Sequence, residues 1–253
     1  MPRFVDLSAP IVPSPPETPE PLRTELQFRG HEAGAADIEA LFGVPPELLR
    51  DGEGWAVEEF LRLGTHNTTH VDAPWHYNST IAGEKAATID ELPLEWFHAP
   101  GVCLDFTAKV DGDAVTGAEI DDALAALDRD IQPLDIVLIR TGRDAFLDAP
   151  DYMIKGPGVT AEATLRLYEL GVRVMGIDAW GWDAPLHLEA EEARAKGEPG
   201  IFWAAHQCDL AYSQIERLAN LAALPPSGFT VSCFPLKVMG GSAGPARVVA
   251  ILD

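Results

Sequence analysis

The sequence predicts an α/β fold built as a single domain. Two short apolar runs, 135–141 and 172–178, are bounded by proline or glycine, as expected of buried strands. Between them, Thr160 can cap a helix that stops at Gly171. A strand, a helix and a second strand in this order predict a parallel pair. The chain has 253 residues, which allows one large core.

The amino-terminal part is predicted to be less regular. Residues 4–13 favour a short strand that ends in prolines, and the proline-rich segment that follows predicts an extended arm over about residues 1–25. This arm is either a surface tail or a cover for a pocket or a partner subunit. Residues 36–50 indicate two short helical pieces, because two adjacent prolines interrupt the apolar pattern.

Later elements follow from local signals. Thr116 and Glu119 form a capping-box pattern that predicts a helix at about 117–130. The charges of a second predicted helix, at 187–197, are most simply explained as a solvated face. The glycine-rich loop at 237–245 lacks the spacing of a phosphate-binding loop and is predicted to be a tight turn. The other predicted segments are strands at 101–106, 229–235 and 246–252.

The composition argues against several classes of partner. The chain has 40 acidic and 18 basic residues and a formal net charge of −22, so nucleic acid and anionic membrane surfaces are not expected partners. Its three cysteines are widely spaced in apolar surroundings, which favours buried free thiols. No segment has the pattern of a signal peptide or of a membrane span. We therefore expect a cytoplasmic protein.

The most informative stretch is 64–78, which contains His66, His70, Asp72 and His76. Three of the seven histidines lie within the eleven residues 66–76, and imidazole and carboxylate are common ligands of zinc, manganese and iron. On an ideal strand all four would share one face, but a rise of four residues is roughly 13 Å, which is long for two imidazoles on one ion. We expect a curved or bulged strand that runs into a loop.

A single histidine here could be an ordinary polar side chain of a threonine-rich strand. The set is harder to explain in that way, because converging imidazoles without a metal would compete for protons and hydrogen-bond partners. The set therefore indicates a metal site or a catalytic site.

The motif also resembles that of a known family. The run His66-Asn-Thr-Thr-His70-Val-Asp72-Ala-Pro-Trp-His76 resembles the signature His-x-Gly-Thr-His-x-Asp-x-Pro-x-His of the metal-dependent hydrolases called the cyclase family, which includes bacterial kynurenine formamidase and isatin hydrolase. It departs at Thr68, where the formamidase pattern has glycine. Weaker similarity extends over nearly the whole chain, from Asp6-Leu-Ser-Ala-Pro-Ile to Gly-Gly-Ser near the end.

The resemblance implies the fold, the ligands and the assembly. The family fold is a swivelling β/β/α arrangement with a central barrel-like mixed sheet and flanking helices, usually as a homodimer or homotetramer. The implied metal is Zn²⁺ or Mn²⁺, with one or two ions per subunit. His76 matches the acid/base position, and Gln214 is a further candidate near the site. The implied metal ligands are His66, His70, Asp72, His206 and Glu216.

The implied reaction is hydrolysis of an amide, lactam or ester bond of a small molecule by metal-activated water, with His76 as proton carrier. A metal-dependent lyase or dehydratase and a non-catalytic metal-binding scaffold are the alternatives. Several aromatic residues lie next to presumed site elements in the sequence, which suits a planar or cyclic substrate, although ordinary packing would also explain them. They are Trp75, Trp180, Trp182, Phe202 and Trp203.

Overall fold

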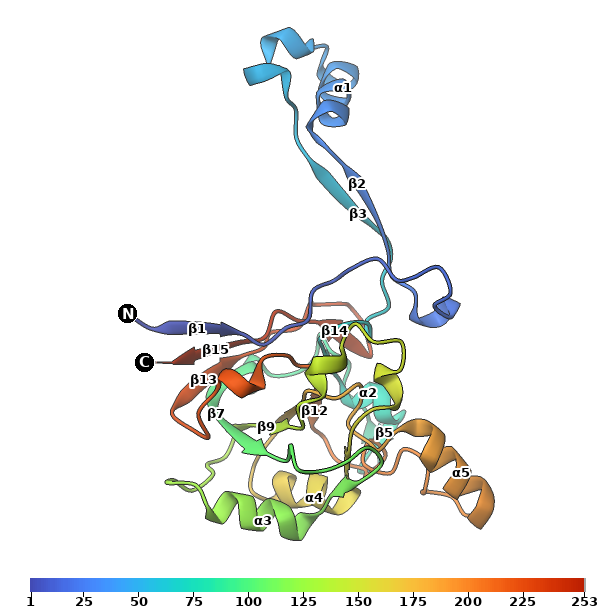
Figure 1. Cartoon of the computed structure of the whole chain (residues 1–253), viewed down its shortest axis with the longest axis vertical. Coiled ribbons are helices and arrows are strands. Elements are labelled where there is room, and N and C mark those ends of the chain that lie inside the picture. Colours follow the sequence, from blue (N-terminus) through green and yellow to red (C-terminus); the bar gives the residue numbers. More distant parts are fainter. Residues whose placement is uncertain (253) are drawn as a thin grey trace. The chain divides into compact units, whose positions relative to one another are not determined.

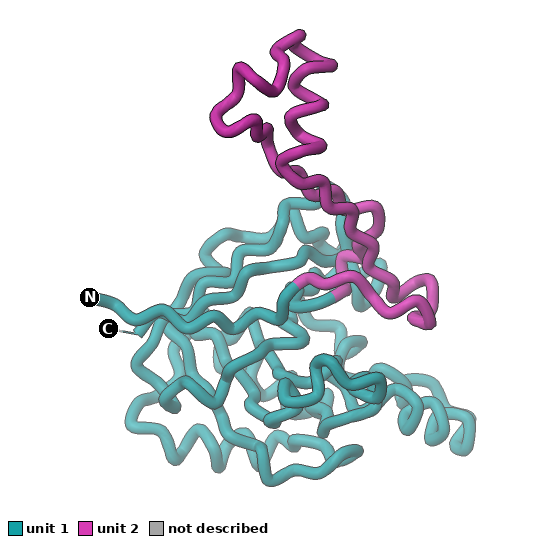
Figure 2. Tube along the Cα trace, turned by 45° about the horizontal axis from the view of Figure 1, so that its top comes forward, with its two compact units in different colours: residues 1–10, 68–253 teal, residues 11–67 magenta. Residues whose placement is uncertain are grey.

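The computed structural model describes residues 1–252, and the chain divides into two compact units. The first unit contains residues 1–10 and the chain from Thr68 onward, and the second contains residues 11–67 (Figure 2). The single domain with an arm over residues 1–25 stays a prediction.

The first unit is built on a nine-stranded mixed sheet (Figure 1). Its four central strands, β7, β9, β11 and β12, are parallel, and the strands on either side of them are antiparallel to their neighbours. The predicted α/β class and the predicted parallel pair are therefore confirmed. In spatial order the strands are β1 (Arg3–Asp6), β15 (Val249–Leu252), β13 (Phe229–Ser232), β7 (His98–Asp105), β9 (Ile136–Arg140), β11 (Val174–Ile177), β12 (Ser213–Glu216), β4 (His70–Asp72) and β14 (Ala243–Pro245).

Strand β11 and residues 136–139 of β9 are apolar throughout because both faces of the sheet are covered there. Val137 and Ile139 of β9 face a core that includes Leu167 of α4, whereas Ile136 and Leu138 face a second core with Phe229 of β13. The helices α3 (Gly117–Ala125) and α4 (Ala161–Glu169) contact each other on the first of these faces (Figure 1). Loops cover the opposite face.

The capping signals located the helices correctly, whereas the helix ends were less predictable. Thr116 and Glu119 form the predicted capping box, and the Thr160 hydroxyl accepts from the Ala163 amide. Helix α3 ends at Ala125, five residues before the predicted end. Beyond it, the acidic residues 128 and 130 would face the negative end of the helix dipole. The predicted solvated helix is α5 (Leu186–Lys196), which ends before Gly197 in the left-handed conformation, with φ 67°.

The second unit contains a ribbon of β2 (Glu25–Arg29) and β3 (Val57–Arg62), with helix α1 (His31–Phe42) between them in sequence. The first of the two predicted helical pieces therefore starts earlier than residue 36, and the ribbon was not predicted. Glycine is required at position 34, because a Cβ there would lie 1.7 Å from the Trp55 carbonyl oxygen.

The first unit also contains a short α-helix and four short strands outside the large sheet. They are α2 (Pro74–Tyr77), β5 (Thr80–Ile81), β6 (Glu84–Lys85), β8 (Ala114–Val115) and β10 (Gly158–Val159).

The cysteines, the glycine-rich loop and the lengths of the helices were also considered in the sequence. The three cysteines are free, with Cys103 and Cys233 buried and Cys208 half-buried, as predicted. The glycine-rich loop is more than a turn, because its end forms β14, which pairs with β4. Across residues 1–252, the helices are all too short or too polar to cross a bilayer.

Candidate metal centre

The candidate centre lies where β4 and β12 run side by side. The two strands are antiparallel, and Glu216 of β12 is the register partner of His70 of β4. Because side chains alternate along a strand, His70, Asp72 and Glu216 share one face, and the intervening Val71 points into the core. His206 reaches the same place from the loop that precedes β12. The four side chains are almost completely buried, at 0, 0, 6 and 3% exposure for His70, Asp72, Glu216 and His206.

Each carboxylate directs one oxygen towards each imidazole. The His70 Nε2 atom lies 3.2 Å from Asp72 Oδ1 and 3.6 Å from Glu216 Oε2. The His206 Nε2 atom lies 3.5 Å from Glu216 Oε1 and 4.0 Å from Asp72 Oδ2. The structure therefore brings together four of the five predicted ligands as a compact set of two imidazoles and two carboxylates.

Hydrogen bonds behind the two imidazoles fix their orientation. His70 Nδ1 lies 2.9 Å from the carbonyl oxygen of Thr68, and His206 Nδ1 contacts the carboxylate of Asp183. A carbonyl and a carboxylate can only accept, so each Nδ1 carries a proton and each Nε2 faces the centre, where it can bind a cation once its own proton has left. This arrangement is typical of histidine ligands held by a second layer of residues.

Thr68 has an unusual backbone that suits the glycine of the motif at this position. Its φ of 59° is in the left-handed region, which glycine adopts readily and a β-branched residue rarely does. The Thr68 hydroxyl donates to the carbonyl oxygen of Ala9 at 3.2 Å, a contact that glycine could not make. The conformation matters because it aims the Thr68 carbonyl at His70.

The charges of the cluster are strongly coupled. Burial alone would lower the pKa of His206, but its hydrogen bonds to Asp183 and Glu216 raise that pKa to about 10. Burial also lowers the pKa of His70, and the carboxylate of Asp72 overrides this and raises it. Burial raises the pKa of Glu216, but the hydrogen bond with His206 and the charges of His206 and His70 together lower it. Two buried carboxylates in this position require positive charge nearby.

His76 occupies a short helical turn beside the cluster. The loop expected there was wrong, because Pro74 starts helix α2 at its first position, where a proline is well tolerated. A ring nitrogen of His76 and a carboxylate oxygen of Asp72 lie within 4.8 Å of each other. The His76 ring also packs against His206, with a centroid distance of 5.8 Å, and edge-on against Trp203, at 4.9 Å.

His66, the fifth predicted ligand, belongs to the second unit. It lies two residues before the first unit resumes at Thr68 and four before His70, so the chain itself keeps it within roughly 14 Å of His70. Its role as a ligand stays a prediction.

The predicted substrate-binding aromatics have different surroundings. Trp182 is fully buried, and its indole N–H donates to the Thr164 hydroxyl at 2.9 Å, so its ring is part of the core. Trp180 is half-buried under the guanidinium of Arg217. Trp75 and Phe202 are exposed at 39 and 42%. Trp203 contacts the cluster through its ring, which stacks on His206 at a centroid distance of 4.3 Å.

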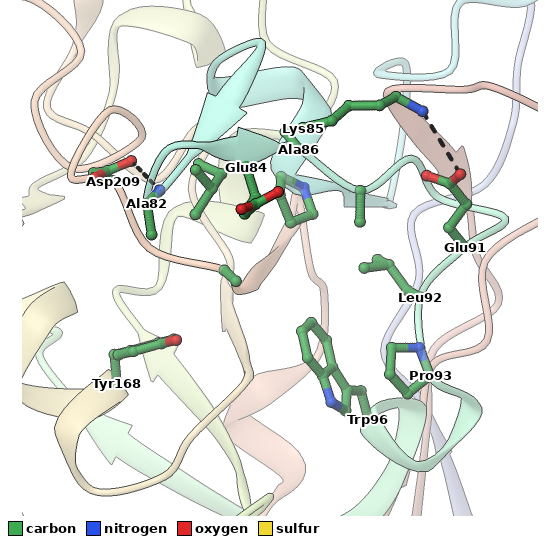
Figure 3. Close-up of a pocket in the computed structure, with 14 residues that line it drawn as sticks. Ala82, Glu84, Lys85, Ala86, Glu91, Leu92, Pro93, Trp96, Tyr168 and Asp209 are labelled. Atoms are coloured by element: carbon green, nitrogen blue, oxygen red, sulfur yellow. Dashed lines mark hydrogen bonds and ion pairs between the residues drawn. The ribbon is translucent and has the colours of Figure 1, made fainter.

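A separate cavity of about 290 Å³ lies beside Pro74 (Figure 3). Trp96, Tyr168 and Leu92 line it, together with the carboxylates of Glu84 and Asp209. None of the predicted metal ligands is among its lining residues. It is therefore distinct from the cluster of β4 and β12.

Asp183 and Glu189 also contribute to the surroundings of the cluster and were not predicted. Asp183 contacts His206, and Glu189 of α5 accepts from the amide of Trp203. Burial and the nearby charge of Asp183 raise the pKa of Glu189 to about 7. The acidic residues of α5 look alike in sequence, and nothing there separates Glu189 from its solvated neighbours.

The residues present fit a divalent cation. The donor set combines neutral imidazole and carboxylate, which zinc and manganese accept, and both Nε2 atoms point inward. Gln214 lies on the same face of β12 as Glu216, and within residues 1–252 its buried Oε1 atom has no hydrogen-bond donor. A cation would neutralise the two buried carboxylates.

Comparisons with known proteins identify a family and several relatives. A family model described as "Putative cyclase" matches residues 5–184. The kynurenine formamidase of Maricaulis maris is 30% identical over 191 residues, which cover 75% of this chain and 78% of the relative. The isatin hydrolase of Roseibium aggregatum is 29% identical over 204 residues, which cover 75 and 73%.

A solved structure extends the similarity to the whole fold. Isatin hydrolase A from Labrenzia aggregata, bound to benzyl benzoate, has a TM-score of 0.72 at 25% identity, over 99% of this chain and 94% of that one. The family model spans well over half of the sequence, and the resemblance carried by the histidine motif is confirmed. The chain belongs to the cyclase family of metal-dependent hydrolases.

Proposed function

We propose that this protein is a metal-dependent hydrolase that cleaves an amide, lactam or ester bond of a small aromatic or cyclic substrate. The observation that carries the proposal is the buried set of two imidazoles and two carboxylates with His76 beside it. Relatives named kynurenine formamidase and isatin hydrolase support action on a carbon–nitrogen bond.

In this proposal the residues divide their work between holding the metal and moving a proton. A bound divalent cation supplies a Lewis acid that polarises a carbonyl group and makes water more acidic. His76 accepts a proton from the attacking water and returns it to the leaving nitrogen or oxygen, which an imidazole can do near neutral pH. Trp203 packs edge-on against His76 and restrains its ring. The proposed ligands are His66, His70, Asp72, His206 and Glu216.

The cation is proposed to be Zn²⁺ or Mn²⁺, with room for two ions per subunit. Support for two ions comes from Asp72 and Glu216, since each directs one oxygen towards His70 and the other towards His206. Carboxylates with this orientation can bridge two cations. Metal content of the purified protein, measured per subunit, distinguishes one ion from two.

A substrate panel tests the function. We expect the protein loaded with Zn²⁺ or Mn²⁺ to hydrolyse at least one of a set of N-formyl arylamines, isatins, lactams, lactones and carbamates, and to lose this activity when a chelator removes the metal. Incorporation of ¹⁸O from labelled water into the product is expected for hydrolysis. Turnover without ¹⁸O would instead favour a lyase, and no turnover of any compound would contradict the proposal.

We also propose that the chain forms a homodimer or homotetramer, in the cytoplasm. The second unit supports this, because it exposes large apolar side chains, including Phe28 at 65%, Leu41 at 68%, Phe42 at 67% and Phe60 at 58%. A two-stranded ribbon is marginally stable alone in water, so a covering surface is expected. The three free cysteines suit a reducing compartment.

Light scattering coupled to size exclusion tests the assembly. We expect a mass of two or four times that of the 27.3 kDa subunit. When Phe28 and Phe60 are both replaced by glutamate, the mass should shift towards that of the monomer. The exposed Val110, at 62%, lies in the first unit, and Val110→Glu serves as the control that should leave the mass unchanged. A wild-type monomer at micromolar concentration would contradict this proposal.

A further inference from the structure

Asp183 holds the segment that carries His206. Its carboxylate is 7% exposed and accepts the backbone amides of Ala205 at 2.8 Å and His206 at 3.2 Å. The same carboxylate contacts Nδ1 of the His206 ring. One side chain therefore fixes both the backbone and the imidazole of a proposed ligand.

Glu189 holds the other end of the same segment. Its Oε2 atom accepts the amide of Trp203 at 2.9 Å, although Glu189 itself lies on α5. Trp203 has a φ of 63°, a left-handed conformation that is unfavourable for a bulky residue. Surrounding contacts must stabilise such a conformation, and the hydrogen bond to Glu189 is one of them.

The strained tryptophan has a specific consequence for the cluster. Its indole stacks on the His206 ring, with an interplanar angle of 23°, and meets the His76 ring edge-on at 88°. Trp203 therefore contacts both a proposed metal ligand and the proposed proton carrier. A shift of the segment would move both imidazoles relative to Asp72 and Glu216.

We infer that Asp183 and Glu189 are positioning residues that hold residues 203–206 as one rigid segment, so that His206 Nε2 faces the metal and the Trp203 ring restrains His76. The inference depends on the proposed function for its effect on metal binding. Its geometric part concerns the protein without metal. If the Asp183 carboxylate served only for packing, Asp183→Asn, which has the same shape, would preserve the segment.

Asp183→Asn tests the first carboxylate. The asparagine can accept only through one oxygen, so its NH₂ group would face either the Ala205 amide, in place of Oδ1, or both the His206 amide and Nδ1–H, in place of Oδ2. The first orientation would displace the backbone of the segment, and the second would turn the imidazole or move its proton to Nε2. We expect the affinity for Zn²⁺ and for Mn²⁺, each measured by competition with a chelator, to fall by about 10- to 100-fold.

Glu189 is tested by a matched pair of substitutions. Glu189→Gln keeps an oxygen for the Trp203 amide and should retain kcat and metal affinity within about twofold, whereas Glu189→Ala should lower kcat by about tenfold or more. Glu191→Ala, on the exposed side of the same helix, is the control and should behave as the wild type. Equal kcat for Glu189→Ala and the wild type would overturn the role of Glu189.

A spectroscopic readout separates this inference from the proposed function. In the metal-free protein, the Nδ1–H of His206 should give a proton resonance far downfield that persists in Glu191→Ala and disappears in Asp183→Asn. Absence of that resonance from the wild type would overturn the inference, as would unchanged metal affinity in Asp183→Asn. If the wild type shows the resonance but binds neither Zn²⁺ nor Mn²⁺, the proposed function fails and the inferred geometry stands. Should Asp183→Asn not fold, the resonance in the wild type and the Glu189 pair decide.

Discussion

Glu216→Gln should abolish metal binding, while the variant should still fold. Glu216 Oε1 accepts the amide of Trp182 at 2.9 Å, and glutamine can keep this hydrogen bond through its remaining oxygen. The NH₂ group then takes the place of Oε2, which lies 3.6 Å from His70 Nε2, and it cannot bind a cation. Because loss of a residue that merely supports a ligand costs about 10- to 100-fold in metal affinity, loss of this ligand should exceed about 100-fold.

The stability of the metal-free variant should fall as well. Against burial and the opposing charge of Asp72, the hydrogen bond and charge of His206, with the charge of His70, lower the pKa of Glu216, so the folded protein stabilises the ionised carboxylate and the glutamine variant loses this contribution. We expect the Tm of metal-free Glu216→Gln to lie below that of the metal-free wild type, while added Zn²⁺ stabilises only the wild type. Glu192→Gln, at an exposed ion pair with Lys196, is the control. Wild-type metal affinity in Glu216→Gln would exclude Glu216 as a ligand.

Local signals in the sequence predicted the frame of the fold. The cap residues Thr116 and Thr160 set the starts of α3 and α4, because a hydroxyl at that position satisfies an amide that the helix leaves unpaired. The apolar run of β9 predicted a strand buried on both faces. These features depend on neighbours in sequence, so a single chain is enough to predict them.

The assembly of the cluster depends on pairing between distant strands, which spacing alone does not reveal. His70 and Asp72 were expected together, but His206 and Glu216 were assigned only through the family resemblance. The structure supplies the reason for their convergence, because β12 pairs with β4 and places Glu216 opposite His70. Residue types alone would not have selected this glutamate from the other acidic residues.

Asp183 and Glu189, which support the cluster, were not predictable for the same reason. Glu189 lies on a helix with no fully buried residue, so its charge fits the pattern of a solvated face. Its contact with Trp203 depends on a loop that folds back across the helix. The start of α2 at Pro74 was also missed, since a proline ends a helix from within but is favoured at its first position. Position within the element decides which effect applies.

His76→Gln should reduce kcat strongly while the metal stays bound. A glutamine side chain keeps polarity near Asp72 but cannot take up and return a proton. Loss of a general acid or base of this kind is expected to lower kcat by about 10²- to 10⁴-fold. The measurement is kcat at saturating metal, paired with Zn²⁺ and Mn²⁺ affinity on the same sample. His187→Gln, an exposed histidine of α5, is the matched control.

The paired measurement decides between the two roles that His76 could have. Its ring nitrogen lies within 4.8 Å of a carboxylate oxygen of Asp72, a separation that either a ligand or a proton carrier could have. A ligand would lose metal affinity and kcat together, and excess metal would restore part of the activity. A proton carrier would lose kcat alone, and excess metal would restore nothing. The edge-on packing of Trp203 against His76 favours the second result, because a restrained ring suits proton transfer over a fixed distance.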